Sequence, residues 1–341
     1  MTARWGFLIA LLGVAALCDA SGEPANSTLA TPNWEVATAY PADTVTGRAA
    51  VEFAQLLNDS KYSPAHFTPR FADRSVSKHA FQAVPNAPFR LLFSGDLGRE
   101  EAILGVSVQP YQANSVEGAF ELNCRAKPAY RSALAHHGLI LLAVVPWPPT
   151  GIWSRSRLST SADLSKMRVR AYDPSSMHIL EALGARVVSL PIQEALDQIR
   201  GGQVDAVMSS GDGAAGRAYA GHLKHFTALR YTYPVSFLVA DKAFFDALPD
   251  KQRTAIVAAG ARTEQHAWDT LPGRIEQNYA QMKAAGVVVQ DPAPTSVVGA
   301  IQRVAADSVG ANFEVAEFLS DFRSCATCSA DSLSTSLSQE Q

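Results

Sequence analysis

Two arginines stand in a short strand pattern, and their type and spacing suit the binding of an anion. The segment Met167 to Tyr172 (MRVRAY) places Arg168 and Arg170 two positions apart. Residues two apart in a strand point to the same face, so the two guanidinium groups share one side of a sheet. A planar guanidinium donates two parallel N–H bonds to a carboxylate, which a lysine cannot do. The alternative for either arginine is a surface salt bridge.

The arginine strand opens a βαβαβ pattern within residues 163–210. A helix that ends at Leu183-Gly184 follows it, then a strand at Val187 to Leu190, a helix at Gln193 to Ile199 and a third strand at Val204 to Met208. Ligands of open α/β sheets bind in the crevice at the carboxyl ends of the strands. We therefore expect an arginine at the end of this first strand to face a ligand crevice.

Other polar and aromatic residues fall where they could complete such a site. The hydroxyls of Ser209 and Ser210 follow the third strand and could donate to a ligand oxygen. Arg155 is a possible second cation, with a solvated strand residue as the alternative. Asp43 and Asp212 are weaker candidates for binding ligand hydroxyls. Aromatic walls exclude water and stack on flat ligands, and the candidates for this role, each with core packing as its alternative, are Tyr40, Trp147 and Tyr172.

Composition describes an ordinary packed globular protein. The 341 residues are 47% hydrophobic and 18% charged, with a formal net charge of −3. This length suits about two domains, by a prior of ~100–200 residues per domain. The sequence has no basic stripe, so we expect no nucleic-acid partner.

The first 20 residues have the pattern of a cleavable signal peptide. Arg4 supplies a positive start, Phe7 to Leu17 an apolar run, and Cys18-Asp19-Ala20 a small-residue exit. The run is shorter than the ~20 residues that a membrane span needs. Lipidation at Cys18 is the alternative, and Leu17 is a poor residue before a lipidated cysteine. We expect an exported, periplasmic protein.

The cysteines and glycines suggest no catalytic or cofactor chemistry. In an oxidising compartment, Cys325 and Cys328 form a local disulfide, or one of them pairs with Cys124. Gly211 to Gly216 (GDGAAG) fits the dinucleotide fingerprint G-x-G-x-x-G, but His225 to Tyr233 lacks the acidic residue that should follow. A ligand-binding or hinge loop is the better interpretation. We expect no catalytic residues, no metal and no cofactor.

Alternating strands and helices predict a three-layer α/β architecture in two lobes. Strand patterns occur at Trp34 to Tyr40 and Gly138 to Val145, and a strand at Tyr231 to Ala240 looks like a return toward the first lobe. Residues 116–137 are mostly helical, and we expect Pro128 to kink or break that helix.

The chain resembles the substrate-binding proteins of tripartite (TRAP-type) transporters, the DctP-like family. The segments 144–153 and 244–259 also look like parts of that family. The most specific matching residues lie in the βαβαβ segment and are Asp163-Leu164, Arg170, Leu183-Gly184-Ala185, Gly202 and Val204-Asp205-Ala206.

The resemblance implies a two-lobed periplasmic-binding-protein-like fold with a ligand cleft between three-layer α/β lobes. After the signal peptide (1–20), the N-terminal lobe would comprise 33–145 plus about 234–262. The C-terminal lobe would comprise 146–233 plus about 263–320, and 323–341 would form a flexible tail. Arg170 aligns with the family's carboxylate-binding arginine, and Arg168 stays the alternative.

The function implied is capture of an organic acid anion and its delivery to the membrane subunits of a TRAP transporter, by a protein that we expect to be monomeric and not an enzyme. Ala171-Tyr172 and Ser209-Ser210 depart from the family's usual residues, which favours a ligand other than a simple C4-dicarboxylate. An exported enzyme such as a hydrolase, or the ligand-binding component of a sensor, are the alternatives.

Overall fold

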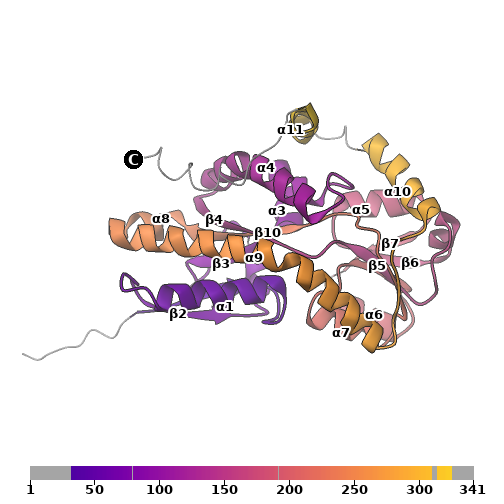
Figure 1. The fold of residues 1–341 in the computed structure, drawn as a ribbon, viewed down its shortest axis with the longest axis horizontal. Helices are drawn as coiled ribbons and strands as arrows, with labels where there is room; N and C mark the ends of the chain where they lie inside the picture. The colour runs from indigo at the N-terminus through magenta and orange to yellow at the C-terminus, as the bar shows by residue number, and fades with distance from the viewer. Residues whose placement is uncertain (1–31, 79, 191, 309–312, 325–341) are drawn as a thin grey trace, which may run out of the picture. The chain divides into compact units, whose positions relative to one another are not determined.

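The computed structural model describes residues 32–78, 80–190, 192–308 and 313–324. The signal-peptide segment and the Cys325–Cys328 pair lie outside these ranges. The described residues form a five-stranded and a six-stranded sheet, with helices on both faces of each (Figure 1). This arrangement confirms the α/β class expected from the sequence. Within the described ranges, no helix is both long enough and hydrophobic enough to cross a lipid bilayer.

The first sheet combines four strands from the first half of the chain with one strand from the second half. Its order is β2 (His66–Arg70), β1 (Asn33–Thr38), β3 (Phe89–Phe93), β10 (Val235–Asp241) and β4 (Leu139–Pro146). The β1 strand pairs in parallel with β2 and β3, whereas β10 runs antiparallel to β3 and β4. The chain therefore returns to the first sheet after building most of the second.

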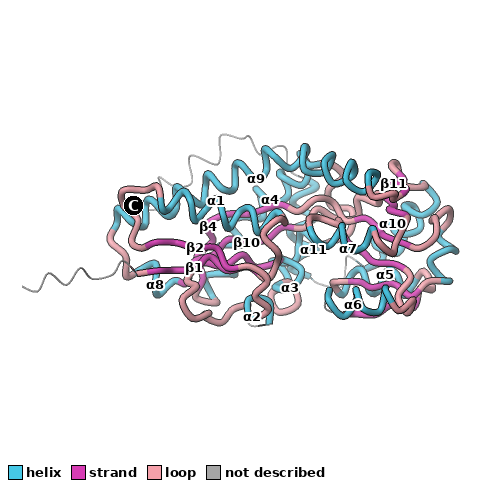
Figure 2. Tube along the Cα trace, turned by 90° about the horizontal axis from the view of Figure 1, so that it is seen from below, coloured by secondary structure: helices cyan, strands magenta, loops and turns pink. Residues whose placement is uncertain are grey.

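Side chains of the first sheet alternate between two cores. Val36, Leu91 and Val145 pack on one face with α1 (Val45–Asn58) and the first half of α9 (Asp250–Ala284). Their neighbours Ala37, Leu92 and Val144 pack on the other face with η1 (Ala102–Val108) and α4 (Val116–His136). The period of two follows from strand geometry, and it gives the three layers that the sequence predicts. Figure 2 shows α1 and α9 running beside these strands.

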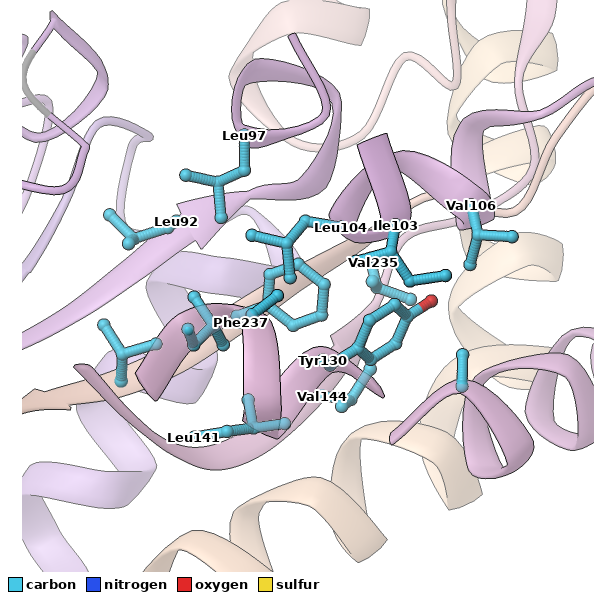
Figure 3. Close-up of a cluster of buried hydrophobic side chains, with 14 of the residues drawn as sticks. Leu92, Leu97, Ile103, Leu104, Val106, Tyr130, Leu141, Val144, Val235 and Phe237 are labelled. Atoms are coloured by element: carbon cyan, nitrogen blue, oxygen red, sulfur yellow. The ribbon is translucent and has the colours of Figure 1, made fainter. Parts of the chain in front are cut away.

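The core under α4 explains why Pro128 does not break that helix. The α4 helix is continuous from Val116 to His136, so the expected break is wrong. Leu122, Ala126, Tyr130 and Leu134 recur at i+4 and are all buried. Tyr130 packs edge-to-face on Phe237 of β10 at 4.8 Å between ring centroids (Figure 3). This packing outweighs the hydrogen bond that proline removes from the helix.

The second sheet contains the arginine strand near one edge. Its order is β11 (Val288–Gln290), β9 (His225–Thr227), β5 (Gly151–Ser154), β8 (Ala206–Ser209), β6 (Arg168–Ala171) and β7 (Arg186–Ser189). The β6, β7 and β8 strands are mutually parallel, whereas β5 runs antiparallel to β8 and β9. The carboxyl ends of β6 and β8 therefore lie at the same edge.

Helices again cover both faces of the second sheet. One core contains residues of α5 (Pro174–Ala182) and α10 (Thr295–Ser308), and the other contains residues of α6 (Ile192–Arg200), α7 (Ala214–Ala220) and the end of α9. The short helix η2 (Ser161–Lys166) contacts α10 beside the second sheet. Four further helices contact elements of the first sheet or its connections, namely α2 (Ser75–Lys78), α3 (Ser94–Leu97), α8 (Lys242–Asp246) and α11 (Phe313–Ser324).

Two extended segments and one helix join the sheets. Residues 147–150 connect β4 to β5, and residues 228–234 connect β9 to β10. These segments bond to each other, since Thr150 N donates to Thr232 O at 2.9 Å and Trp147 N to Pro234 O at 2.8 Å. The α9 helix contacts β4 and α1 of the first sheet and α7 and β11 of the second. The sheets are thus joined by backbone that is itself hydrogen-bonded.

The glycine-rich segment after β8 is a close-packed turn. Gly211 and Gly213 have φ of +69° and +60°, a region that L side chains rarely adopt. A Cβ at Gly216 would lie 1.9 Å from the Gly211 carbonyl oxygen. The glycines therefore let the first turn of α7 pack against the end of β8.

The surroundings of two glycines predict that their substitution by alanine has opposite effects on stability. Gly216→Ala should lower the free energy of unfolding by at least about 2 kcal/mol, because the clash is with backbone. Gly273→Ala, at an exposed position of α9 with open space around the added methyl, should raise it by up to about 1 kcal/mol. Urea denaturation of both variants measures the difference. A neutral Gly216→Ala would show that the turn is not packed as described.

Candidate ligand-binding site

Arg170 is held at its Nε by one backbone carbonyl. It lies in β6 between β7 and β8, opposite Val188 and Val207. Its Nε donates to the carbonyl oxygen of Leu190 at 3.0 Å. Among the described residues, no other hydrogen bond or ion pair to this guanidinium is recorded. The two terminal nitrogens are therefore free to donate to a ligand.

The charge of Arg170 acts on groups from both sheets. It lowers the pKa of Tyr40 and Asp96, which follow β1 and β3 of the first sheet. It also lowers the pKa of Tyr172, which follows β6 of the second sheet, and of Tyr219 in α7. In each group burial raises the pKa by more than Arg170 lowers it. Arg170 therefore lies near enough to these four groups for its charge to act on them.

Aromatic rings form a wall beside this charge. Tyr40 packs on Trp147 with ring centroids 4.8 Å apart and on Phe93 at 6.2 Å. Phe93 in turn lies 6.0 Å from Tyr172. Trp147 is buried, and its Nε1 donates to Ser236 Oγ at 2.9 Å. The structure therefore gathers Tyr40, Trp147 and Tyr172, as the sequence predicts, and adds Phe93.

A pocket opens beside Tyr40 on the first-sheet side of this wall. Its cavity volume is about 10 Å³, and its lining includes Tyr40, Val76, Leu91, Phe93 and Asp96. A volume of this size has room for about one water molecule.

Tyr172 is tied to both segments that join the sheets. Its hydroxyl lies 3.1 Å from Thr150 Oγ1 and 3.0 Å from Thr232 Oγ1. Arg99, which follows α3, donates from Nη2 to the Tyr172 carbonyl oxygen at 2.9 Å. Tyr172 therefore ties the end of β6 to both segments that join the sheets.

Ser209 and Tyr219 lie together at the end of β8. Ser209 Oγ accepts from Gly211 N at 3.1 Å. It also lies close enough to lower the pKa of Tyr219, although the two side chains do not form a hydrogen bond of good geometry. The Tyr219 hydroxyl is buried and has no hydrogen-bond partner among the described residues. Ser210 is half-buried beside them.

The remaining arginine candidates lie near the opposite end of β8. Arg155 follows β5, and because β5 is antiparallel to β8 it lies beside Asp205, with Arg155 Nε 4.0 Å from Asp205 Oδ1. It also donates to the carbonyls of Ile199 and Val204. Arg168 N donates to Asp205 Oδ2 at 2.9 Å. The structure therefore does not place Arg155 beside Arg170. Arg168 is the first residue of β6, and Arg170 lies near the end of the same strand.

Asp212 joins elements of both sheets through a buried carboxylate. It accepts hydrogen bonds from Val45 N at 2.8 Å, Arg274 Nε at 2.6 Å and Asn278 Nδ2 at 2.9 Å. Arg274 also donates to Asp43 O at 2.5 Å. Arg217 pairs with the Asp43 carboxylate at 2.5 Å. The carboxylates considered for ligand hydroxyls are thus bonded by protein donors, and Asp212 is not free to act as a catalytic base.

Metal chemistry has no evident place here. Within the described ranges, no group of three His, Cys, Asp or Glu side chains could hold an ion. The chemistry that the arrangement offers is reversible binding of an anion beside apolar rings.

Sequence reasoning missed residues on the first-sheet side and on α7. Phe93 ends the short buried strand β3 and Asp96 follows it, so the rule that identified Arg170 would have found them if applied to the first lobe. Tyr219 lies in a helix with no local signal of its role. Only the turn at Gly211 to Gly216 brings it back to the end of β8.

With this geometry in place, comparison with known proteins identifies the family. The model of "bacterial extracellular solute-binding protein, family 7" (DctP) matches residues 90–308, more than half of the chain. The chain therefore belongs to this family of solute receptors, which is not a family of enzymes.

Similar proteins agree with this family and with the fold. A solute-binding protein of Albidiferax ferrireducens is 29% identical over 201 residues, which is 57% of this chain and 59% of that relative's length. The crystal structure of DctP7, a Bordetella pertussis extracytoplasmic solute receptor binding pyroglutamic acid, has a TM-score of 0.79. It is 23% identical and covers 85% of this chain and 99% of its own. A marine metagenome TRAP solute-binding protein specific for pyroglutamate has a TM-score of 0.78, is 20% identical, and covers 87% of this chain and 100% of its own. The two-lobed α/β fold is thereby confirmed.

The buried Asp212 predicts a large loss of stability when its charge is removed. Asp212→Asn leaves Arg274, whose side chain is 9% exposed, without its carboxylate. We expect the free energy of unfolding to fall by about 3–5 kcal/mol, as when one partner of a buried ion pair is removed. Asp197→Asn, at a side chain that is 76% exposed, is the matched control and should change it by less than about 0.5 kcal/mol. Equal effects in urea denaturation would contradict the bridging role of Asp212.

Removing the Tyr172 hydroxyl should cause a smaller loss of stability. Tyr172→Phe removes two hydrogen bonds but leaves Thr150 and Thr232 bonded to each other at 3.2 Å. The free energy of unfolding should fall by about 1 kcal/mol. Tyr62→Phe, at a residue that is 38% exposed, is the control and should have no measurable effect. A Tyr172→Phe variant as stable as the wild type would show that the hydroxyl does not stabilise the segments 147–150 and 228–234.

Proposed function

We propose that the protein captures a small organic acid anion outside the cytoplasm and delivers it to the membrane subunits of a TRAP transporter. The observation that carries the proposal is the Arg170 guanidinium, which donates from Nε to Leu190 O and has no partner for its terminal nitrogens among the described residues. Its charge acts on Tyr40, Asp96, Tyr172 and Tyr219. The similar solved structures from Bordetella pertussis and the marine metagenome, described as binding pyroglutamate, support the class of ligand.

Arg170 would hold the ligand carboxylate with its two terminal nitrogens. Hydrogen bonds to charged groups contribute about 1.5–3 kcal/mol each to stability. A dissociation constant near ~1 μM corresponds to about −8 kcal/mol. A bidentate contact could supply a substantial part of that free energy. Contact with Tyr40, Phe93 and Trp147 would supply the rest by excluding water from the apolar part of the ligand.

The two lobes would be those expected from the sequence, 33–145 plus about 234–262 and 146–233 plus about 263–320, closing about the connections at 147–150 and 228–234. The bond from Arg99 to Tyr172 O and that from Val45 N to Asp212 join elements of the two lobes. They would break on opening and re-form on closure. A ligand shifts such an equilibrium only through contacts that differ between the two states. Arg170 on one side and Tyr40 on the other meet that condition.

The protein would act as a monomer in the periplasm, after cleavage of residues 1–20, and would return its ligand chemically unchanged. Catalysis needs a nucleophile or base within reach of the bound molecule. The buried carboxylate of Asp212 is already bonded, since it accepts three protein hydrogen bonds. Ser209 would contact the ligand from the end of β8, with Ser210 as the alternative.

The test of this function is the loss of binding in Arg170→Ala. Titration calorimetry with L-pyroglutamate should show at least tenfold weaker affinity. The melting temperature of the empty protein should stay within about 3 °C of the wild type, because Arg170 makes only one recorded protein hydrogen bond among the described residues. Arg168→Ala, two positions earlier in the same strand, is the matched control and should bind as the wild type does.

Three results would count against the proposal. Unchanged affinity in Arg170→Ala would remove this residue from the site. A tenfold loss in Arg168→Ala with normal binding in Arg170→Ala would assign the carboxylate to the other arginine. Recovery of a chemically altered ligand after incubation, measured by mass spectrometry, would favour an enzyme.

A further inference from the structure

Tyr219 has a buried hydroxyl without a hydrogen-bond partner among the described residues. The residue lies in α7 and is 0% exposed. Buried polar groups of folded proteins are bonded in the large majority of cases, so this hydroxyl calls for an explanation. Because a phenol can donate its proton, a hydrogen-bond acceptor beside it would offset the cost of its burial.

The register of the second sheet places the Arg170 side chain on the face that α7 covers. Arg170 of β6 lies opposite Val207 of β8, and Val207 lies opposite Trp153 of β5. The side chains of directly paired residues share one face of a sheet. Val207, Trp153 and Tyr219 belong to one core, whereas Val169, the residue before Arg170, belongs to the core on the other face. Arg170 and Tyr219 therefore lie on the same side of the sheet.

Ser209 lies on this face too, at the end of β8. It follows Val207 by two residues, so its side chain points the same way. Its Oγ accepts from Gly211 N at 3.1 Å. Burial raises the pKa of Tyr219, whereas the charge of Arg170 and the nearby Ser209 lower it. The Tyr219 hydroxyl therefore lies toward the edge at which β6 and β8 end.

Trp153 and the glycine turn hold the Tyr219 ring in place. The Trp153 and Tyr219 ring centroids are 5.5 Å apart. Gly211, with φ of +69°, lies against the indole, because a Cβ there would be 2.3 Å from Trp153 Cζ2 and 2.8 Å from Nε1. Trp153 Nε1 also has no recorded partner among the described residues, but the Gly211 backbone covers it. Of the two buried groups, the Tyr219 hydroxyl is thus the better donor to a ligand.

We propose that the Tyr219 hydroxyl donates a hydrogen bond to the same ligand carboxylate that Arg170 holds. The inference rests on the proposed function, in which Arg170 binds that carboxylate. An ionised carboxylate only accepts hydrogen bonds and has about four positions for donors, so a guanidinium and a phenol can bind it together. An amide at this end of the ligand would turn its N–H groups toward donors, which disfavours the amide of an acid relative to the acid itself.

Tyr231 offers a matched control for the loss of a buried hydroxyl. It is also 0% exposed, and its hydroxyl also has no recorded partner among the described residues. It lies in the segment 228–234 and packs in the core on the opposite face of the second sheet. Tyr231→Phe is therefore the same chemical change on the face that does not carry Arg170.

The first experiment measures L-pyroglutamate binding by titration calorimetry for the wild type, Tyr219→Phe and Tyr231→Phe. Tyr219→Phe should weaken the affinity about tenfold, as expected for the loss of one hydrogen bond to a charged group. Tyr231→Phe should bind within about twofold of the wild type. The melting temperature of ligand-free Tyr219→Phe should equal or exceed that of the wild type, because the variant no longer buries a hydroxyl without an acceptor.

A double-mutant cycle tests whether Tyr219 and Arg170 bind the same group. Arg170→Lys keeps the charge but removes the planar pair of donors. If both residues hold one carboxylate, the loss of affinity in the double variant should differ from the product of the two single losses by at least about threefold. Tyr231→Phe combined with Arg170→Lys should give the product of the single losses.

The outcomes distinguish this inference from the function beneath it. If Arg170→Ala loses binding while Tyr219→Phe keeps it, if both tyrosine variants lose affinity equally, or if the cycle shows no coupling, the role of Tyr219 is wrong and the proposed function stands. A melting temperature of Tyr219→Phe more than about 3 °C below the wild type would assign the hydroxyl a structural role and overturn the inference. If the wild type does not bind L-pyroglutamate, or Arg170→Ala binds it equally well, both proposals are overturned.

Discussion

A fixed positive charge between two sheets is the constraint on which the site depends. A guanidinium removed from water is costly unless hydrogen-bond acceptors and counter-charges compensate it. Arg170 receives one backbone carbonyl at its Nε and the electrostatic influence of Asp96, but the described residues give its terminal nitrogens no partner. The strand β6 places it near the edge where parallel strands end, and the residue is half-buried. An anion can accept hydrogen bonds from these terminal nitrogens.

The same constraint explains why the connections between the sheets are so closely bonded. Under the proposed function, a ligand must first reach this charge and then be enclosed by the two lobes. The paired segments at 147–150 and 228–234 join the two sheets, and the Tyr172 hydroxyl lies against Thr150 and Thr232. The buried carboxylate of Asp212 fixes α1 and α9 to the end of β8. The residues proposed to contact the ligand, Arg170 and Ser209, therefore lie close in sequence to Tyr172 and Asp212, which join the two sheets.

The sequence predicted best what depends on local patterns. The βαβαβ unit, the arginine at the end of its first strand and the return of the chain to the first sheet follow from strand and helix periodicity and from the family resemblance. The continuity of α4 through Pro128 could not be predicted, because it depends on packing against Phe237, more than 100 residues away. Tyr219 and Asp96 were missed because their place in the site is set by the meeting of two sheets. Arg155 was overrated because the antiparallel direction of β5, which carries it to the far end of β8, is invisible in the sequence.

One contact decides whether this description of the protein is right: a carboxylate held by the guanidinium that Leu190 O orients. A crystal structure of the full-length mature protein with a bound organic acid measures it directly. We predict ligand oxygens about 2.7–2.9 Å from both terminal nitrogens of Arg170, the distance of charge-assisted hydrogen bonds. A bound acid lying elsewhere, with the Arg170 guanidinium turned into solvent, would contradict the account.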